Sequence, residues 1–436
     1  MDIITIIYIM LALSVSSFFV MFAVYSAIEK NFRPVIVSII ITIILISIFL
    51  LIYNFDIHNI FKLVTILTIV SFIFLYFTPF GKTSDISVIK SDEKFDERDT
   101  MFARNDYKPD SKKYNEYYRI NPDKKKIDDK LRSMPDLLER GGKYFDHNRA
   151  AYVKGLFEIE GLLANYTEGG INPQKTIINQ HEATKLIKEK AIHLGAAEVG
   201  IVLLDQRWVY SNVGRGPEKW GAQIKNNHKF VVCYTVEMDY YKVSNAPDFD
   251  VIEESANQYI NAQKISITLA NFIRELGYSA RAHVSGSNYQ IIMPAVAYGA
   301  GLGELGRHGY LISKKYGSRV RLGAITTDIP LIADKPVMLG VQDFCKICRK
   351  CAHNCPSKAI TEGKKQMVRG VEKWQLNIEQ CYRYWRSMGT DCALCMKVCP
   401  FSHPNNVVHN VVRYGIKKSS IARRISLWGD NLFYGK

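Results

Sequence analysis

The run CKICRKCAHNCP, residues 345–356, decides the fold of the C-terminal part of the chain. Its cysteines follow the pattern C-x2-C-x2-C-x3-C-P, and a shorter run, CALCMKVCP, occupies residues 392–400. Two-cluster bacterial ferredoxins have this pattern, in which the fourth cysteine of a run binds the other cluster. The second run lacks one cysteine at the usual spacing, and Cys381 can replace it from eleven positions upstream. The sequence therefore predicts a ferredoxin-like domain with two [4Fe–4S] clusters.

Eight of the nine cysteines lie between residues 345 and 399. We assign one cluster to Cys345, Cys348, Cys351 and Cys399, and the other to Cys355, Cys381, Cys392 and Cys395. Zinc sites usually combine two short Cys or His pairs and do not require this run. Disulfides are disfavoured in the reducing cytoplasm, where the membrane segment described next places the domain. The ninth cysteine, Cys233, is expected to be a small buried apolar residue of a strand.

Residues 1–80 predict a membrane anchor with three transmembrane helices. Three uncharged stretches, residues 3–28, 34–55 and 63–81, have 26, 22 and 19 residues and are rich in Ile, Leu, Val and Phe. A helix needs about 20 apolar residues to cross a bilayer. A secretory signal would have a basic start and one short apolar region. The chain begins with Met-Asp and has three successive stretches, which excludes a single soluble domain.

The charge of the chain lies outside this anchor. There are 57 Lys and Arg residues against 42 Asp and Glu, a net charge of +15, and residues 1–80 hold three of each sign. Lys and Arg collect on the cytoplasmic side of membrane spans, and the first loop and the segment after the third span hold six of them, against Lys62 alone opposite. We expect a multi-pass protein of the cytoplasmic membrane whose catalytic domain faces the cytoplasm. Membrane lipid and acidic electron carriers then suit the basic charge, and no nucleic acid is expected.

The soluble part shows three regions. Residues 81–154 are dense in both charges and predict a juxtamembrane connector that is mostly solvated. Residues 155–335 alternate helical and strand patterns and predict a core of the α+β class, although the strand order does not follow from them. Residues 336–436 hold the ferredoxin-like domain and the C-terminal tail. The helices expected in the core are 181–194 and 252–276, and the expected strands are 199–204, 230–236 and 320–329.

The segment Gly301-Leu-Gly303-Glu-Leu-Gly306 satisfies the pattern G-x-G-x-x-G of dinucleotide-binding folds. That reading requires a strand before the glycines and an apolar helix after them. Met293-Pro294 precedes this segment instead, and Arg307-His308-Gly309 follows it. Glu304 would also place a carboxylate where a pyrophosphate binds. We therefore disfavour NAD and expect the glycines to let the backbone approach a large flat cofactor.

Several blocks of the sequence resemble the respiratory-type reductive dehalogenases. Together they cover residues 95–435, and the three fused apolar stretches replace the twin-Arg signal of typical members, as in the transmembrane subgroup. The blocks are FDERDTMFAR (95–104), GELGRHG (303–309), RVRL with TDIPL (319–331), the segment from CYRYW to the last Cys-Pro (381–400), and the C-terminal tail (413–435).

The resemblance implies a cobalamin-type corrinoid, held base-off in a nitroreductase-like core, and an organohalide substrate. By similarity, Tyr259 is the proton donor, Arg321 lies beside it, and Asn288 helps to orient groups. A guanidinium near a phenol favours the phenolate and lowers its pKa. Arg319 is two residues from Arg321 and would share its face of a strand, so it is the alternative partner. The expected cofactor contacts are Gly301, Gly303, Gly306 and Arg319.

Two other functions remain open from the sequence. An epoxyqueuosine-reductase-like enzyme would use similar cofactors on tRNA, but the three apolar stretches and the Trp- and Tyr-rich block around Cys381 argue against it. A non-catalytic iron–sulfur electron-transfer subunit would not need the large region before the cysteines. The sequence does not identify the electron donor, which could be a quinol, a ferredoxin or a flavodoxin. It also does not identify the organohalide.

Overall fold

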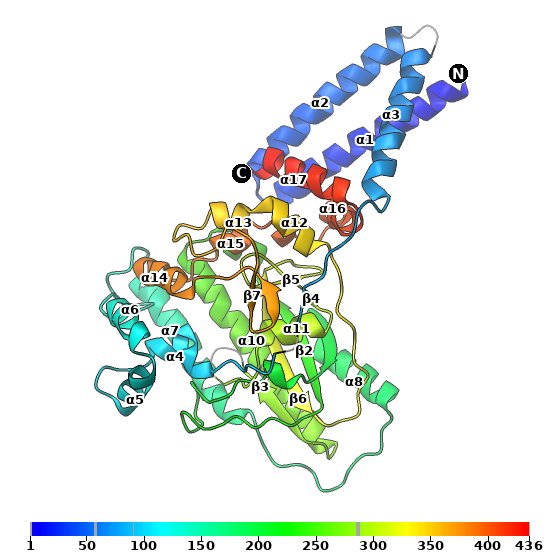
Figure 1. Cartoon of the computed structure of the whole chain (residues 1–436). Coiled ribbons are helices and arrows are strands. Elements are labelled where there is room, and N and C mark those ends of the chain that lie inside the picture. Colours follow the sequence, from blue (N-terminus) through cyan, green and yellow to red (C-terminus); the bar gives the residue numbers. More distant parts are fainter. Residues whose placement is uncertain (1, 56–58, 90, 285–287, 436) are drawn as a thin grey trace. The chain divides into compact units, whose positions relative to one another are not determined.

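The computed structural model describes all residues except 1, 56–58, 90, 285–287 and 436. The chain forms two compact units, each built from separate segments (Figure 1). The helical unit comprises residues 1–85, 338–348 and 403–436, and the sheet unit comprises residues 86–337 and 349–402. The predicted ferredoxin-like region is thus divided between the two units. The other predicted domain limits, at residues 80, 154 and 335, stay predictions.

Three long apolar helices dominate the helical unit. They are α1 (Ile3–Ile28), α2 (Phe32–Phe55) and α3 (Ile60–Phe77). Most of their Ile, Leu, Val and Phe side chains are exposed, which suits contact with lipid rather than with water. Within the described part of the chain, these are the helices long and apolar enough to cross a membrane. The prediction of three N-terminal apolar helices is confirmed.

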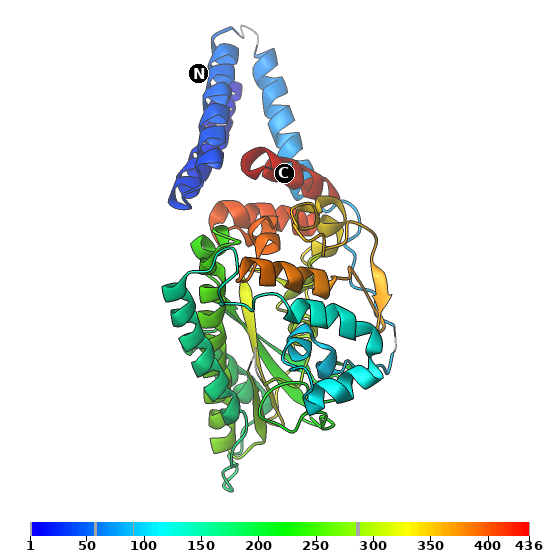
Figure 2. The same cartoon turned by 90° about the vertical axis from the view of Figure 1, so that its left-hand side faces the viewer.

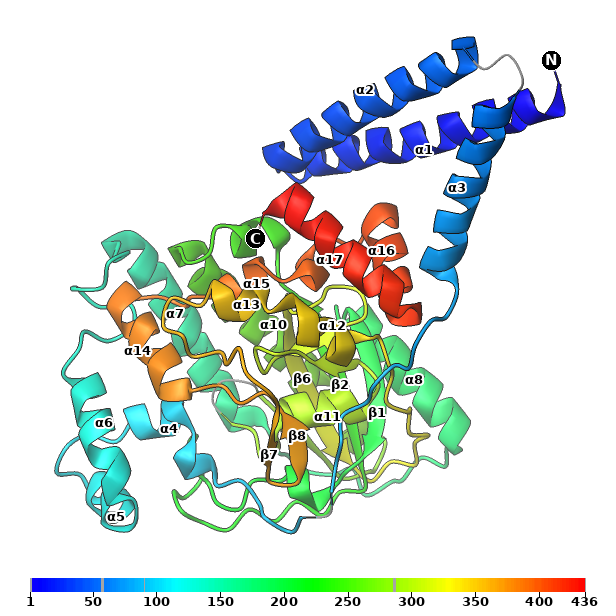
Figure 3. The same cartoon turned by 45° about the horizontal axis from the view of Figure 1, so that its top comes forward.

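The rest of the helical unit consists of α12 (Val341–Cys348), α16 (Val407–Lys418) and α17 (Ser420–Tyr434) (Figure 3). Phe22 of α1 packs against Val408 and Phe433, and the ring centres of Phe22 and Phe433 are 4.7 Å apart. Glu29, which follows α1, accepts hydrogen bonds from Asn406 Nδ2 at 2.8 Å and His409 Nε2 at 3.2 Å. The connection between α1 and α2 therefore lies at the same end of the unit as the N-terminal part of α16.

The sheet unit is organised around a four-stranded antiparallel sheet with the order β1-β2-β6-β3. The strands are β1 (Glu198–Leu203), β2 (Phe230–Glu237), β3 (Ala280–His283) and β6 (Val320–Thr327). Two helices cover one face, α8 (Gln180–His193) and α10 (Phe249–Glu275), and the short α11 (Met293–Gly299) packs on the other (Figure 2). The predicted α+β class is confirmed.

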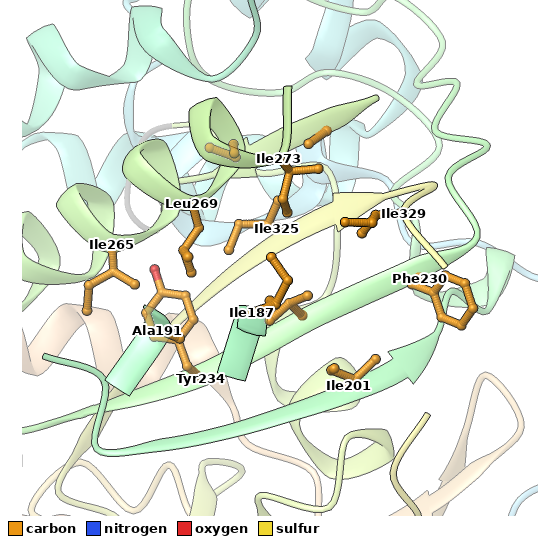
Figure 4. Packing of buried hydrophobic residues seen from close by; sticks show 14 of the residues in the cluster. Ile187, Ala191, Ile201, Phe230, Tyr234, Ile265, Leu269, Ile273, Ile325 and Ile329 are labelled. Atoms are coloured by element: carbon orange, nitrogen blue, oxygen red, sulfur yellow. The ribbon is translucent and has the colours of Figure 1, made fainter. Parts of the chain in front are cut away.

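The main core lies between the sheet and the helices α8 and α10. Tyr234 of β2 is fully buried there, and its hydroxyl lies 2.6 Å from Ser266 Oγ of α10, which satisfies the only polar group of the side chain. The helical patterns place apolar residues on a single face, so both helices bury them against the sheet. Figure 4 shows Ile187, Ala191, Ile265, Leu269, Ile273, Ile325 and Tyr234 among the side chains of this core.

Much of the stretch 97–163 forms short helices, whereas the charge of residues 81–154 predicted a mostly solvated connector. They are α4 (Met101–Asn105), α5 (Lys112–Ile120), α6 (Pro122–Arg132) and α7 (His147–Leu163). Arg104 and Asp128 are 2% and 1% exposed and form an ion pair with 2.6 Å between Nη2 and Oδ1. Tyr118 donates a further hydrogen bond to Asp128 at 2.7 Å. Arg104 and Asp128 therefore bind each other and are not solvated by water.

The cysteine segment of the sheet unit consists of short elements. They are α13 (Lys350–His353), the hairpin of β7 (Gln366–Val368) and β8 (Val371–Lys373), α14 (Ile378–Met388) and α15 (Leu394–Lys397). A second hairpin, β4 (Gly303–Leu305) with β5 (Leu311–Ser313), contains two of the glycines of the G-x-G-x-x-G pattern. The element that follows this hairpin is strand β6 and not a helix, which agrees with the prediction that the segment does not form a dinucleotide-binding fold.

Candidate active site and iron–sulfur segment

A cavity of about 430 Å³ opens in the sheet unit. Helices α7 and α10, strand β6 and the cysteine segment all contribute to its wall. Eight aromatic side chains line it together with aliphatic ones, and the polar side chains are few, as in many small-molecule sites. The charged groups of the lining are Glu160, Arg215, Arg321 and Asp391, and the aromatic ones are Phe102, Phe157, Tyr210, Tyr259, Tyr289, Tyr310, Tyr382 and Trp385.

Tyr259 and Arg321 meet at this cavity. Tyr259 comes from the middle of α10 and Arg321 from β6, and the guanidinium carbon of Arg321 lies 4.9 Å from the centre of the Tyr259 ring. A cation at this distance from the face of a phenol ring is attracted by it. The structure therefore brings together the two residues that the sequence predicted as a catalytic pair.

The other side of the guanidinium is held by Ser255 and Asp391. Arg321 Nη2 donates a hydrogen bond to Ser255 Oγ and lies 3.6 Å from Asp391 Oδ2. Ser255 Oγ donates in turn to Asp391 Oδ2 at 2.7 Å. Ser255 lies one helical turn before Tyr259, so both face the same side of α10. These contacts fix Arg321 in the orientation that keeps it against the tyrosine.

The net effect of the site on the pKa of Tyr259 differs from our expectation. Burial raises this pKa above its ordinary value, while Arg321 opposes the rise and Asp391 and Glu160 add to it. The expectation considered only the guanidinium, which does lower the pKa but is outweighed by the loss of hydration of a phenolate. Tyr259 therefore stays protonated at neutral pH, as a proton donor must be.

The sequence reading missed Glu160, Arg215 and Tyr289, which line the same cavity. Burial raises the pKa of Glu160 to about 7, against the opposing charges of Arg215 and Arg321. Burial likewise raises the pKa of Tyr289 to about 12. No short spacing connects these residues with Tyr259 in the sequence. The signal available for Glu160 was a carboxylate between Ile159 and Gly161 in the apolar C-terminal half of α7.

Asn288 does not line the cavity. Its Oδ1 accepts a hydrogen bond from Arg281 Nη2 at 2.7 Å, and its Nδ2 donates to the carbonyl of Ala164 at 3.0 Å. Both ends of the amide are thus used to join β3 to the end of α7. This placement corrects the expectation that Asn288 orients groups at the reaction centre.

Arg319 is also placed differently from our expectation. It is 1% exposed, and its Nε donates to the carbonyl of Ser402 at 2.6 Å while Nη1 donates to the carbonyl of Met238. Strand β6 begins at Val320, so the alternation of side chains along a strand does not extend to Arg319. The geometry therefore selects Arg321 as the partner of Tyr259, and Arg319 lies outside the lining of the cavity.

The three glycines of the G-x-G-x-x-G pattern pack against other atoms of the chain and are not among the residues that line the large cavity. A Cβ on Gly301, whose φ is +73°, would lie 2.4 Å from the carbonyl oxygen of Lys335. One on Gly303 would lie 2.1 Å from the carbonyl oxygen of Ile312, and one on Gly306 would lie 2.8 Å from Cε1 of His308. These positions lack room for a Cβ because backbone or side-chain atoms of the chain lie against them. The expected contact of the glycines with a cofactor stays a prediction.

The cysteines of the second predicted set lie around one small cavity of about 30 Å³. This cavity is lined by Cys355, Cys381, Cys392 and Cys395. Of the first set, Cys351 and Cys399 are buried in the sheet unit, whereas Cys345 and Cys348 lie on α12 in the helical unit. The structure thus brings the second set together within one unit. The grouping of the first set into one site stays a prediction.

The donor set around the small cavity fits an iron–sulfur cluster. Burial and the neighbouring thiols raise the pKa of Cys381 to about 12 and that of Cys392 to about 11. Neighbouring thiolates repel one another, and binding to metal cations stabilises them. Among the described residues, no three Cys, His, Asp or Glu side chains converge closely enough to bind a single ion. Four cysteine thiols around one cavity are the donor set that a [4Fe–4S] cluster uses.

The two cavities share a wall. Both are lined by Tyr310, Leu376, Cys381, Trp385 and Ala393. A cluster bound by Cys381 would therefore border the large cavity directly, without an intervening layer of protein. The wall of the large cavity is mostly aromatic and aliphatic, which suits contact with the flat faces of an organic cofactor or substrate.

Comparison with known proteins agrees with this arrangement. Residues 344–403 match the family model of the 4Fe-4S dicluster domain. The chain is 30% identical over 332 residues to the tetrachloroethene reductive dehalogenase of Desulfitobacterium hafniense, which covers 64% of this chain and 59% of the relative. It is 30% identical over 289 residues to the tetrachloroethene reductive dehalogenase of Sulfurospirillum multivorans, covering 58% of this chain and 57% of the relative. The chain thus spans somewhat more than half the length of these curated relatives.

The fold is similar to that of a solved structure. A catabolic reductive dehalogenase in complex with 3-bromo-4-hydroxybenzoic acid superposes with a TM-score of 0.65 at 24% sequence identity. The superposition covers 81% of this chain and 48% of the other. At this identity the match establishes the common fold. The family model identifies a 4Fe-4S dicluster domain in the sequence, and the structure carries this segment on the fold of the dehalogenase.

Proposed function

The chain belongs among the homologues of the reductive dehalogenases, which are oxidoreductases, and from that premise we propose that it is a membrane-anchored reductive dehalogenase acting on organohalides. The observation that carries the proposal is the pairing of Tyr259 with Arg321 in a cavity that shares a wall with the cysteine-lined cavity. A cluster bound at this wall would lie beside the proposed proton donor. Reductive removal of a halogen requires both an electron source and a proton donor.

The large cavity is the proposed site of a base-off corrinoid. When bound, a corrinoid supplies the strongly reducing metal centre that breaks a carbon–halogen bond. The aromatic residues Tyr210, Tyr289, Tyr310 and Trp385 would hold its flat face. The polar residues Tyr259 and Arg321 would remain for the substrate.

Replacement of a halogen by hydrogen consumes two electrons and one proton and releases a halide ion. In our proposal Tyr259 gives its hydroxyl proton to the carbon that loses the halogen. Arg321 stabilises the phenolate that remains, and Asp391 and Ser255 keep the guanidinium in place. A positioned general acid of this kind accelerates a reaction by about 10²- to 10⁴-fold.

The electrons would enter through the dicluster domain. The cluster that we assign to Cys355, Cys381, Cys392 and Cys395 borders the cavity and would be the last carrier. The other cluster, which we assign to Cys345, Cys348, Cys351 and Cys399, would act as the earlier carrier. The three apolar helices would hold the enzyme at the cytoplasmic membrane, where a quinol, a ferredoxin or a flavodoxin could reduce it.

Cofactor content of the reconstituted full-length protein tests the proposal. We expect about eight iron atoms and about one cobalt atom per chain. Cys381→Ser should lower the iron content, whereas Cys233→Ser, a buried cysteine of β2 outside both sets, should not. Iron without any corrinoid would contradict the proposed enzyme.

Turnover then separates the two corrinoid enzymes that the sequence left open. The loaded protein is supplied either with a halophenol or with an RNA containing epoxyqueuosine, under the same reducing conditions. Release of halide from the first substrate is the expected result. Reduction of the RNA without release of halide would favour the epoxyqueuosine-reductase-like function instead.

A further inference from the structure

His308 lies at the cysteine-lined cavity with one ring nitrogen unused. The side chain is 2% exposed and lines that cavity with Cys355, Cys381, Cys392 and Cys395. Its Nδ1 accepts a hydrogen bond from the backbone N–H of Tyr310 at 3.1 Å. A neutral imidazole that accepts at Nδ1 carries its proton on Nε2. His308 Nε2 is buried and has no hydrogen-bond partner among the described residues, which is costly for a polar group.

The ring of His308 is held in this orientation by its neighbours. Gly306 leaves the space that the ring fills, because a Cβ there would lie 2.8 Å from Cε1 of the imidazole. The guanidinium of Arg307 donates to the carbonyls of Thr361 and Gly363 at 2.9 and 3.0 Å. It also lies 4.6 Å from the ring centre of Trp374. Through Arg307, the segment that carries His308 thus contacts the cysteine segment both before the β7–β8 hairpin and after it.

We propose that His308 donates its Nε2–H to a sulfur atom of the iron–sulfur cluster bound by Cys355, Cys381, Cys392 and Cys395, and that this hydrogen bond raises the reduction potential of that cluster. Reduction adds negative charge to the cluster, and a donor aimed at its sulfur stabilises the reduced form more than the oxidised one. His308 is thus a positioning residue that tunes an electron carrier, and it does not touch the substrate.

The inference rests on the dicluster domain and on our assignment of its ligands, not on the dehalogenase activity. A hydrogen bond of this kind also gives a reason for the histidine in the segment Gly303–Gly309, which the pairing of Tyr259 with Arg321 does not use. The hydrogen bond that Nδ1 accepts from the backbone N–H of Tyr310 fixes the tautomer that carries its proton on Nε2. A neutral ring with a fixed tautomer is a stable donor.

An EPR-monitored redox titration of the reconstituted full-length protein tests the inference. His308→Leu, which removes the donor, should shift the midpoint potential of one cluster to a more negative value and leave the other unchanged. His308→Gln, whose amide can donate, should restore part of the shift. His283→Leu is the matched control, because His283 is also fully buried in the sheet unit but lines neither cavity. Both clusters should keep their potentials in this control.

Electron–nuclear double resonance provides a second readout. In D₂O the wild-type protein should show an exchangeable deuteron coupled to the cluster whose potential shifts, and His308→Leu should lose this coupling. Unchanged potentials in His308→Leu with full iron content would overturn the inference. Loss of a whole cluster in that variant would overturn it as well, since it would make His308 a ligand rather than a donor. None of these measurements needs corrinoid or organohalide, so they stand if the proposed enzymatic function fails.

Discussion

The guanidinium of Arg321 lies between the ring of Tyr259, 4.9 Å from its centre, and the carboxylate of Asp391, 3.6 Å from Oδ2. Asp391 immediately precedes Cys392, one of the four cysteines around the small cavity. A single side chain thus contacts the proposed proton donor and the segment that carries the proposed electron donor. This arrangement makes the position of Tyr259 dependent on the fold of the cysteine segment.

Replacement of the Tyr259 hydroxyl should stop turnover while leaving the cofactors in place. Tyr259→Phe keeps the ring that packs at Arg321 but removes the proton, so we expect dehalogenation to fall by about 10²- to 10⁴-fold. Halide release measures the rate, and iron and cobalt contents verify the site. Tyr278→Phe is the control, because its hydroxyl donates to the carbonyl of Thr176, outside the cavity. Unchanged halide release in Tyr259→Phe would remove this residue from the mechanism.

Arg321 should increase the rate of halide release without making that rate fall at alkaline pH. Because burial raises the pKa of Tyr259 above its ordinary value, the phenol stays protonated and halide release should not decline between about pH 7 and about pH 9. Arg321→Met should lower turnover by roughly 10²-fold, since it removes the charge that stabilises the developing phenolate. It also raises the pKa of Tyr259 further, so its profile should be flat over the same range. A decline of the wild-type rate in this range would contradict the proposed donor.

Arg319 provides the comparison for this variant. Its guanidinium joins the end of β2 to Ser402 and does not reach the cavity. Arg319→Met should therefore lower the temperature of unfolding, while the folded fraction keeps its turnover number. An equal loss of turnover in both variants would mean that Arg321 acts only through the fold.

The sequence predicted those parts of the molecule that depend on local spacing. The cysteine runs, the three apolar stretches and the strand at 230–236 each carry their signal within a few residues, and the structure has the corresponding elements at these places. The four cysteines of the second set also lie together, although Cys381 is separated from the run at 392–400. Spacing is informative here because most ligands of a cluster come from one short run, and the fourth cysteine of each run follows at a fixed distance.

The errors have a common physical origin, which is dependence on partners distant in the sequence. The charges around Arg104 and Asp128 suggested solvent exposure, but each is buried against the other. The position of Arg319 depends on where β6 begins, and a shift of one residue changes the face of a side chain. Glu160 reaches the cavity because α7 packs on α10, which no local pattern shows.

Glu160 should make the stability of the protein depend on pH. Its pKa is about 7 when folded and lies near 4.5 when unfolded, so the favourable protonated form is fully present below about pH 4.5 and is lost as the pH rises through about 7. The cost at alkaline pH is roughly 3 kcal/mol if the whole shift applies. Glu160→Gln should therefore lose less stability than the wild type between about pH 5 and about pH 8. Unfolding temperatures at both pH values measure the difference, and equal pH dependence of the two proteins would contradict it.

The ion pair of Arg104 and Asp128 should matter far more than an exposed pair. Asp128→Asn leaves the guanidinium of Arg104 buried with less compensation, and breaking such a pair typically costs about 3–5 kcal/mol. Glu139→Gln breaks the exposed pair of Glu139 with Lys154, which should cost about 0–1 kcal/mol. Denaturant unfolding followed by tryptophan fluorescence compares the two variants. Similar losses would show that the helices of residues 86–163 do not depend on the buried pair.

The membrane arrangement predicts the side from which a protease can cut. Glu29, at the end of α1, is bound by Asn406 and His409, so the first loop and the C-terminal helices share one side of the membrane if α1 crosses it. The Lys and Arg distribution predicts that this side is the cytoplasm. Lys175 lies in a segment without helix or strand, near Ile177, which is fully exposed, and trypsin should cut there. Cleavage should occur in inverted vesicles and not in intact right-side-out ones, and Lys175→Gln should remove the resulting fragment. Cleavage at Lys175 only in right-side-out vesicles would place the catalytic cavity outside the cytoplasm.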